Sequence, residues 1–282
     1  MSLALQSLKF DVDLLLRSQG VSPATTVPFI VKKYGSLLAL AAGRSPRFTV
    51  RDAKYTARNI SELGTLQSCI TDMSSVVIAS KILPDQCTVI DVGANVGQFC
   101  HALKVFRPAA KVVCLEPDQE SFRRLQLNTQ DFSDVHLLNV GAGERSESLQ
   151  FFRHDLSGMS SFVPLAEHDY PESRIETLDV GPLDEYLEPF VELLHGQIDL
   201  LKIDVEGFES SVLKGAGNTL RRSRYLLIEL SLARDTDGTS NLDVLDLVRV
   251  HCPKARIVRL GRALGSTASG DPVCQDALLS LQ

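Results

Sequence analysis

The stretch that decides the fold is Thr88-Val-Ile-Asp-Val-Gly-Ala-Asn-Val-Gly97. Its first five residues are typical of a buried strand, and Gly93 and Gly97 permit a tight turn that leads into a helix. The apolar residues of 99–106 recur at spacings of three and four, which predicts an amphipathic helix that ends before Pro108. The stretch therefore predicts a strand–turn–helix unit with its turn open to a ligand.

The same alternation continues outward from this unit. Strands are expected at 111–115, 135–140, 149–152, 198–203, 225–230, 256–260 and 277–281, and helices at 118–130, 183–194, 212–220 and 242–250. Alternating strands and helices of these lengths predict an α/β fold with a doubly wound, mostly parallel sheet, and the last two strands are expected to form a hairpin. Ligands of such sheets bind at the carboxyl ends of the strands.

The first 86 residues lack this clear alternation. Helices are expected around 3–16 and at 30–42 and 68–83, with two short strands beginning at Phe48 and Tyr55. Residues 1–86 carry ten Lys and Arg against six Asp and Glu, whereas 87–282 carry 19 against 29. This asymmetry predicts a mainly helical N-terminal extension over 1–86 and a main domain over 87–282.

The composition restricts the class of protein. Of 282 residues, 44% are apolar and 23% are charged, which is ordinary globular usage, and the net charge of −6 argues against nucleic acid as a partner. The longest apolar run, 37–42, is too short to cross a membrane. The first ten residues do not resemble a secretory signal, and the six cysteines lack zinc spacing, so a cytoplasmic protein with reduced thiols is expected. The oligomeric state is not predicted.

The turn at 93–97 differs from a dinucleotide-binding loop. The pattern GxGxxG would need glycine at the positions of Asn95 and Gln98, which argues against a nicotinamide-dependent oxidoreductase. Free N–H groups at the helix start suit a carboxylate, and Asp91 at the strand end could attract an ammonium, directly or through water. An amino acid carries both groups, so the methionine part of S-adenosylmethionine fits, whereas Asp91 would repel a diphosphate. The alternative is a glycine-rich turn without a ligand.

Glu116 and Pro117 follow the second strand of this unit. A carboxylate at that position can accept hydrogen bonds from both hydroxyls of a ribose, and it would oppose a 2′-phosphate. Taken alone, a glutamate at the end of a strand is a solvated surface charge as often as it is a ligand-binding residue. Together with the 91–97 loop, it predicts a nucleoside site.

Acidic residues also follow the apolar strand at 198–203. Asp204 or Glu206 could orient an acceptor or take its proton. The structural alternative is an ion pair between Lys202 and Asp204, with Glu206 capping the next helix. His154 and His168 are less favoured bases. Asp204 and Glu229 could hold Mg²⁺, but two acids do not make a site, so no metal is predicted.

Four segments together resemble the FkbM family of S-adenosylmethionine-dependent methyltransferases. They are TVIDVGANVGQF, CLEPD, LNVGAG and DLLKIDVEGFESSVLKGA, and the resemblance covers about residues 87–230. It implies the Rossmann-like class I methyltransferase fold, with a seven-stranded sheet whose last strand is antiparallel. It also implies O-methylation, often of hydroxyls on sugars or natural products.

The resemblance also implies roles for individual residues. It places Asp91, Gly93, Asn95 and Gly97 at the methionine end of the cofactor and Glu116, followed by Pro117, at the ribose. It places Asn139, beside Gly141 and Ala142, near the adenine. Asp204 and Glu206 would face the methyl group, where Asp204 also contacts the cofactor, and Lys202 is a further candidate catalytic residue. A catalytically inactive scaffold or sensor that binds the same cofactor is the competing function. An inactive protein of this kind would carry the same cofactor-binding motifs as an active methyltransferase.

The segment 151–190 is expected to choose the acceptor, which is a small molecule or a glycan. Ser157–Phe162 could close over this acceptor as a lid, while the aromatic residues of the segment could equally pack it onto the sheet. Asp204-Val-Glu-Gly207 replaces the Asn/Asp-Pro-Pro-aromatic segment of amino-group methylases that act on nucleic-acid bases. Nucleic acid is therefore not expected as the acceptor.

Overall fold

The structure is a computed structural model. It describes residues 30–31, 33–36, 39, 42–50, 53–70, 81–154, 158, 160–164, 174–192, 194, 196–231, 241–261 and 274–282. The expected helix around 3–16 lies outside these residues. Among the described residues, the structure contains no helix long and apolar enough to cross a membrane.

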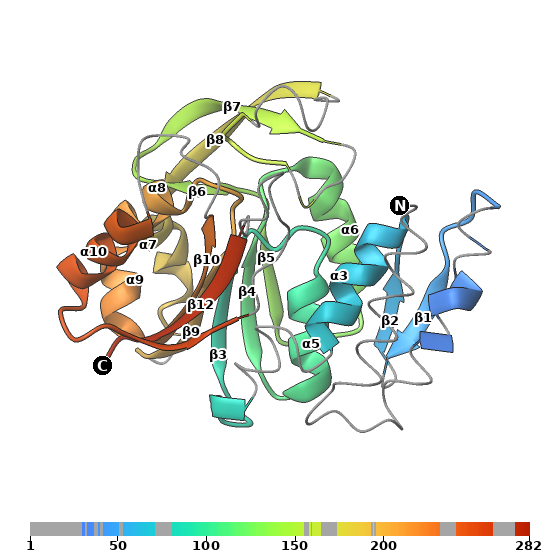
Figure 1. Ribbon diagram of the computed structural model, residues 1–282, viewed down its shortest axis with the longest axis horizontal. Helices are drawn as coiled ribbons and strands as arrows, with labels where there is room; N and C mark the ends of the chain where they lie inside the picture. The colour runs from blue at the N-terminus through green and yellow to red at the C-terminus, as the bar shows by residue number, and fades with distance from the viewer. Residues whose placement is uncertain are drawn as a thin grey trace, which may run out of the picture.

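A seven-stranded sheet forms the centre of the molecule (Figure 1). Its spatial order is β11-β12-β10-β9-β3-β4-β5. The strands are β3 (Thr88–Val92), β4 (Lys111–Leu115), β5 (Val135–Leu138), β9 (Ile198–Ile203), β10 (Ser223–Ser231), β11 (Arg256–Leu260) and β12 (Cys274–Ser280). β12 is antiparallel to β10 and β11, while β10, β9, β3, β4 and β5 run parallel. This confirms the predicted seven-stranded α/β sheet with an antiparallel last strand.

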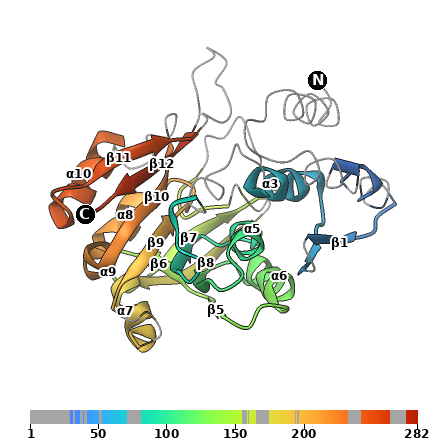
Figure 2. The same ribbon diagram turned by 90° about the horizontal axis from the view of Figure 1, so that it is seen from below.

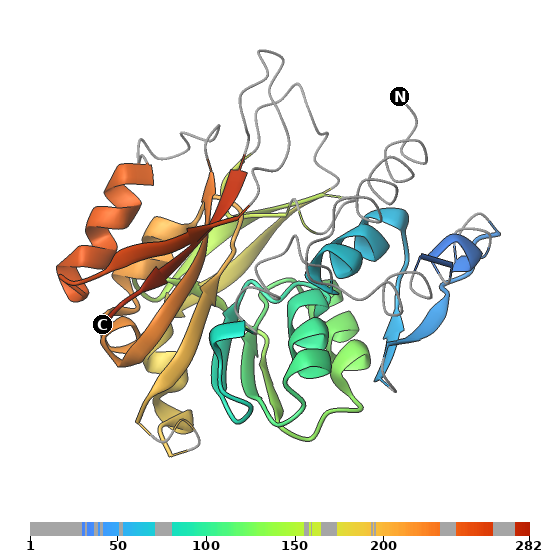
Figure 3. The same ribbon diagram turned by 60° about the horizontal axis from the view of Figure 1, so that its bottom comes forward.

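Helices cover both faces of this sheet (Figures 1 and 3). One face carries α3 (Ile60–Ile70), α5 (Gln98–Phe106) and α6 (Gln119–Thr129), and the other carries α7 (Leu183–Leu187), α8 (Glu209–Lys214), α9 (Gly217–Arg222) and α10 (Asn241–His251). Successive strand residues enter opposite cores, as the two-residue period of a strand requires: Val89 packs on the α5 side and Ile90 on the α9 side. Both strand faces are thus buried, which explains the continuous apolar runs.

A second, three-stranded sheet lies across one end of the central sheet. It contains β6 (Gly141–Gly143), β7 (Glu147–Arg153) and β8 (Arg174–Pro182) in the order β6-β8-β7. Figure 1 shows it above the central strands, and Ser161 in the connection from β7 donates hydrogen bonds to the carbonyls of Val205 and Glu206 just beyond β9. The insert therefore sits over the carboxyl ends of the parallel strands.

The N-terminal layer combines a hairpin and a helix. The expected short strands are present as β1 (Arg47–Val50) and β2 (Ala53–Thr56), which pair antiparallel. The helix α3 (Ile60–Ile70) was not predicted; it begins where Asn59 accepts a hydrogen bond from the Glu62 N–H and Glu62 accepts one from the Arg58 N–H. Of the helix expected over 68–83, residues 68–70 form the end of α3 and 81–82 are helical, whereas 71–80 lie outside the described residues. The described residues between 30 and 39 are helical, as predicted. The division at residue 86 stays a prediction.

Two helices are shorter than the sequence predicts. The helix expected over 212–220 is two helices, α8 and α9, which are separated at Gly215. A Cβ atom there would lie 1.9 Å from the Gly143 carbonyl oxygen, so the position requires glycine, which disfavours a continuous helix. The helix expected over 183–194 is α7 followed by the 3₁₀ helix η2 (Glu188–Phe190), with Pro189 at its start. Figure 2 shows α7 at the opposite end of the sheet from β11 and β12.

Candidate active site

The turn between β3 and α5 is held open by three residues with positive φ. Gly93, Asn95 and Gly97 have φ angles of 79°, 49° and 91°. A Cβ at Gly93 would lie 1.9 Å from the carbonyl oxygen of Asp204, so only glycine lets β3 and β9 end this close together. The N–H groups of Gly93 and Ala94 both donate to the Leu115 carbonyl, at 3.1 and 3.0 Å. The turn is thereby joined to the ends of both neighbouring strands.

Glu116 lies directly beside this turn. Its carboxylate accepts hydrogen bonds from the backbone N–H groups of Asn95 (2.8 Å) and Asp118 (2.9 Å). The side chain is buried, and burial raises the pKa of the Glu116 carboxyl to about 8. The two backbone hydrogen bonds lower this pKa, but their effect is smaller than that of burial. The exposed Asn139 donates its amide to the carbonyls of Glu116 and Pro117. These three residues meet where the sequence predicts the adenosine.

The donors and acceptors of this turn fit S-adenosylmethionine. The amide oxygen of Asn95 is buried and has no hydrogen-bond partner in the described structure, so it can accept from an ammonium. The Glu116 carboxylate, at the neighbouring strand end, has lone pairs left for ribose hydroxyls. When bound there, the methionine end would lie at Asn95 and the ribose at Glu116.

Asp91 lies deeper than the sequence predicts. Its side chain is fully buried and forms an ion pair with Lys202 Nζ at 3.2 Å. Burial raises the pKa of the Asp91 carboxyl, and the nearby Lys202 lowers it. The protein itself thus supplies a cation to Asp91, and the role of Asp91 at the methionine end of the cofactor stays a prediction.

Lys202 joins the two strand ends. Its Nζ also lies 3.1 Å from Asp204, and it stands over the Phe99 ring. Burial alone would lower the pKa of the Lys202 ammonium, but Asp204 and Asp91 raise it well above its usual range. The expected ion pair between Lys202 and Asp204 is therefore present. Lys202 thus stays charged and is paired with Asp204, and its predicted catalytic role stays a prediction.

Three carboxylates gather at the ends of β9 and β10. Asp204, Glu206 and Glu229 each offer an oxygen, and these oxygens all lie within 4.8 Å of one another. The expectation of no metal stays a prediction, and oxygen ligands in this number would suit Mg²⁺. The structure thus brings Glu229, already a candidate partner of Asp204 for Mg²⁺, beside both Asp204 and Glu206, because β10 lies beside β9.

Glu209, which the sequence reading left out, shapes this acidic loop. Its carboxylate accepts hydrogen bonds from the N–H groups of Val205 and Gly207, at 3.1 and 3.2 Å. Glu206 and Gly207 have φ angles of 57° and 98°, so the chain turns sharply between β9 and α8. Glu209 therefore holds the loop before α8, and no side chain of the described residues caps the start of this helix, so the capping role considered for Glu206 is not seen. The position of Glu209 two residues after a glycine was the available signal.

Gly141 and Ala142 lie within the second sheet. Both belong to β6 and pair with Val180 and Gly181 of β8, and Ala142 is part of the apolar core. A Cβ at Gly141 would meet Val180 at 2.8 Å. This packing explains the glycine. The adenine role of both residues stays a prediction.

The insert packs onto the site through aromatic rings. Phe162 lies 5.0 Å from Phe151 and 5.2 Å from Phe208, measured between ring centroids. Ser161 is tied to the 205–206 carbonyls, so this part of the expected lid is closed against the loop. His154 is buried at the end of β7, and His168 lies outside the described residues. The aromatic residues placed by the structure thus favour packing over a mobile lid.

The sequence from Asp91 to Cys252 matches the family described as "Methyltransferase FkbM domain". The match covers more than half of the chain and includes every site residue described above. The chain belongs to the FkbM methyltransferase family. It is therefore a methyltransferase, and S-adenosylmethionine is its cofactor.

This methyltransferase resembles several curated proteins. It is 27% identical over 173 residues to the 2-O-methyltransferase NoeI of Sinorhizobium fredii. This match covers 57% of this chain and 70% of NoeI. It is 23% identical over 222 residues to the hexuronic acid methyltransferase AglP of Haloferax volcanii, covering 76% of this chain and 88% of AglP. A match at 29% identity over 207 residues to the AMB antimetabolite synthetase AmbE of Pseudomonas aeruginosa covers 60% of this chain but only 10% of AmbE.

Similar solved structures include TYW2 of M. jannaschii in complex with AdoMet. That structure is 11% identical, with a TM-score of 0.42, and the match covers 84% of this chain and 86% of TYW2. The fibrillarin pre-rRNA processing protein of Methanococcus jannaschii is 10% identical, with a TM-score of 0.46. The match covers 84% of this chain and 82% of the fibrillarin chain.

Proposed function

We propose that this methyltransferase transfers a methyl group to a hydroxyl oxygen of a small molecule or sugar. The observation that carries the proposal is the cluster of Asp204, Glu206 and Glu229 beside the cofactor turn. An aliphatic hydroxyl becomes a good nucleophile only when its proton leaves, and a carboxylate at hydrogen-bond distance can accept that proton. NoeI and AglP, whose names specify a 2-O-methyltransferase and a hexuronic acid methyltransferase, support this class of acceptor.

Different residues of the site would bind the cofactor and accept the proton of the acceptor. Bound S-adenosylmethionine supplies an activated methyl group, so the protein mainly has to align the acceptor oxygen. The turn at 93–97 and Glu116 would hold the cofactor. Asp204, whose side chain is 38% exposed, would accept the hydroxyl proton, while Lys202 fixes the orientation of its carboxylate.

The test is turnover of S-adenosylmethionine with a panel of sugars and natural-product alcohols, with Mg²⁺ and with EDTA. Asp204→Asn should reduce turnover by about 10²- to 10⁴-fold, because it removes the proton acceptor, while the affinity for S-adenosylhomocysteine is retained. Asp246→Asn is the control, since Asp246 lies exposed on α10 and pairs with Arg249 of the same helix. Unchanged turnover in Asp204→Asn would contradict the proposed base.

The same assay separates an enzyme from a catalytically inactive scaffold. A scaffold would bind S-adenosylhomocysteine but give no turnover with any alcohol of the panel. Loss of turnover on adding EDTA, restored by Mg²⁺, would show that the three carboxylates act through a cation. An RNA oligonucleotide included in the panel tests the expectation that nucleic acid is not the acceptor.

A further inference from the structure

A polar cavity of about 360 Å³ lies between the start of α3, the start of α6 and the end of β7. Its size falls within the range of small-molecule pockets. Residues from all three elements line it, among them Arg58, Glu62, Glu120, Arg153, His154 and Ser160. The cofactor residues Gly93, Asn95, Glu116 and Asp204 are not in its lining, so it is a separate compartment of the described structure.

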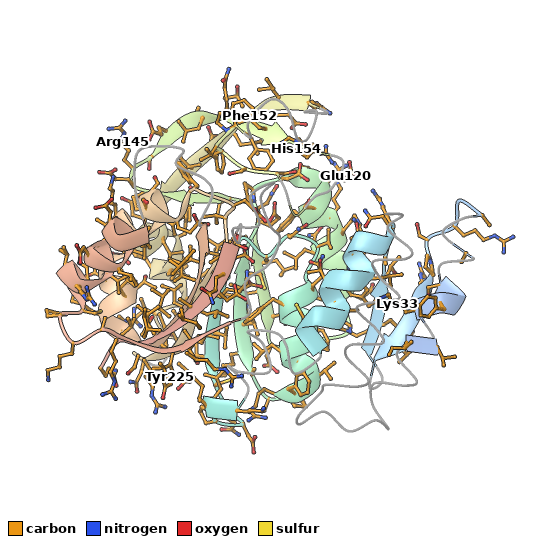
Figure 4. The ribbon with its side chains drawn as sticks, viewed as in Figure 1. Lys33, Glu120, Arg145, Phe152, His154 and Tyr225 are labelled. Carbon is orange, nitrogen blue, oxygen red and sulfur yellow. The ribbon has the colours of Figure 1, made fainter. Side chains whose placement is uncertain are left out.

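His154 is the feature of this cavity that points to a ligand. Its side chain is only 5% exposed, and both ring nitrogens are buried without a hydrogen-bond partner in the described structure. A neutral imidazole offers one donor and one acceptor, and leaving both unsatisfied costs free energy. Figure 4 shows His154 and Glu120 at the same end of the molecule, where the insert meets α6.

Each arginine around His154 is paired with a carboxylate. Glu120 pairs with both Arg58 and Arg153, and the buried Glu62 pairs with Arg124. The fourth arginine of the lining, Arg174, pairs with Glu176. A free anion would therefore have to compete with carboxylates that already hold these guanidinium groups. Hydroxyl groups suit this lining better, because each can accept from a guanidinium N–H and donate to a carboxylate or an imidazole nitrogen.

The cavity borders the site at two points. The Ser160 hydroxyl accepts a hydrogen bond from the backbone N–H of His154, and the next residue, Ser161, donates to the Glu206 carbonyl in the acidic loop. Asp118 also lines the cavity, and its N–H donates to the Glu116 carboxylate. A molecule held in the cavity would therefore lie next to both the cofactor turn and the acidic loop.

We propose that this cavity is a subsite for an uncharged sugar ring of the acceptor, with His154 and Glu120 binding its hydroxyls. This deepens the proposed function and rests on it, because a sugar there would belong to the molecule that is methylated. It names both the class of ligand and the residues that select it.

The test is ligand-detected NMR on the full chain, with and without S-adenosylhomocysteine. The probes are the methyl α-pyranosides of D-glucose, D-galactose and D-mannose, with D-glucuronate and inorganic phosphate as anionic probes. We expect saturation transfer to at least one neutral glycoside. Its affinity should fall about two- to tenfold in His154→Phe and in Glu120→Gln, because each change removes hydrogen bonds to a hydroxyl.

Matched variants locate the effect. His154→Gln keeps a donor and an acceptor and should retain more binding than His154→Phe. His136→Phe, on β5, and Glu147→Gln, on β7, change the same residue types outside the cavity lining and should bind like the unaltered chain. Affinity for S-adenosylhomocysteine and the melting temperature show whether each variant is folded. Should His154→Phe fail to fold, Glu120→Gln and His154→Gln still decide the matter.

Three results would overturn the subsite. They are no saturation transfer to any neutral glycoside, binding of phosphate or glucuronate alone, and glycoside binding that is equal in His154→Phe, Glu120→Gln and the controls. Methyl transfer to an alcohol alongside any of these results would leave the proposed function standing. Failure to bind S-adenosylhomocysteine would instead count against the proposed function.

Discussion

Glu116 couples cofactor binding to pH at the scale of one residue. Its pKa of about 8 means that the empty site holds mostly the protonated acid at neutral pH, although two ribose hydroxyls require the carboxylate as acceptor. Affinity for S-adenosylhomocysteine should therefore rise about tenfold between pH 7 and pH 9. Calorimetric titration across this range measures it. Glu116→Gln should bind more weakly, with a flat profile, and a flat profile in the unaltered chain would refute the expectation.

The same group makes folding depend on pH in the opposite direction. Because its folded pKa lies above the ordinary 4.5, its contribution to stability is fully present below pH 4.5 and is lost as pH rises through about 8. Glu116→Gln cannot ionise. We expect urea unfolding to show that this variant gains stability relative to the unaltered chain between pH 6 and pH 9. If the difference in the free energy of unfolding between the two proteins did not change between pH 6 and pH 9, burial would not raise the pKa of this carboxyl.

The ammonium of Lys202 neutralises the carboxylates of Asp91 and Asp204. Removing its ammonium in Lys202→Met leaves Asp91 buried without a cation, which should cost about 3–5 kcal/mol in the free energy of unfolding. Urea unfolding measures this, and adding Asp91→Asn should recover part of the loss. Lys214→Met is the control, since the Lys214–Glu144 pair is exposed and its loss should stay within about 0.5 kcal/mol. Equal costs for the two lysines would contradict this role.

At the scale of an element, the β3–α5 turn depends on a glycine for two separate reasons. Gly93 has a φ of 79°, and its missing Cβ leaves room for the Asp204 carbonyl. Gly196 has nearly the same φ, 81°, but has open space around it. Gly196→Ala should therefore cost only the backbone strain of roughly 1–2 kcal/mol.

Gly93→Ala should cost roughly 3 kcal/mol or more and abolish binding of S-adenosylhomocysteine, because β3 and β9 must separate. Thermal unfolding and calorimetry on the two alanine variants check this comparison. If both variants lost the same stability and both bound the ligand, the close approach of the two strand ends would not be needed.

At the scale of the whole molecule, the N-terminal layer and the sheet share one core. Leu63 of α3 belongs to the same buried cluster as Val89 of β3 and Leu103 of α5. Leu63→Ala should therefore destabilise the whole chain by about 2–5 kcal/mol while unfolding stays a single transition. Leu127→Ala, at a side chain 55% exposed on α6, should have little effect. Two separate transitions would show that residues 1–86 fold as their own domain.

Local sequence signals determined the central fold and most of the site. The apolar runs of β3, β4 and β9 and the glycines at 93 and 97 depend on neighbouring residues in the chain, so their pattern is readable without a structure. The acids Glu116, Asp204 and Glu206 follow strands directly. Parallel strands end at one edge of a sheet, so these acids were predicted to share a site, and the structure places them at that edge.

Tertiary structure alone decided the features that join distant segments. Asp91 is paired with Lys202 only because β3 and β9 are neighbours in the sheet. The requirement for glycine at 215, between α8 and α9, comes from the close approach of the Gly143 carbonyl, which is distant in the sequence. The cavity around His154 needs three elements from separate parts of the chain. Such contacts depend on packing between segments, whereas sequence periodicity reports only which face of each segment is buried.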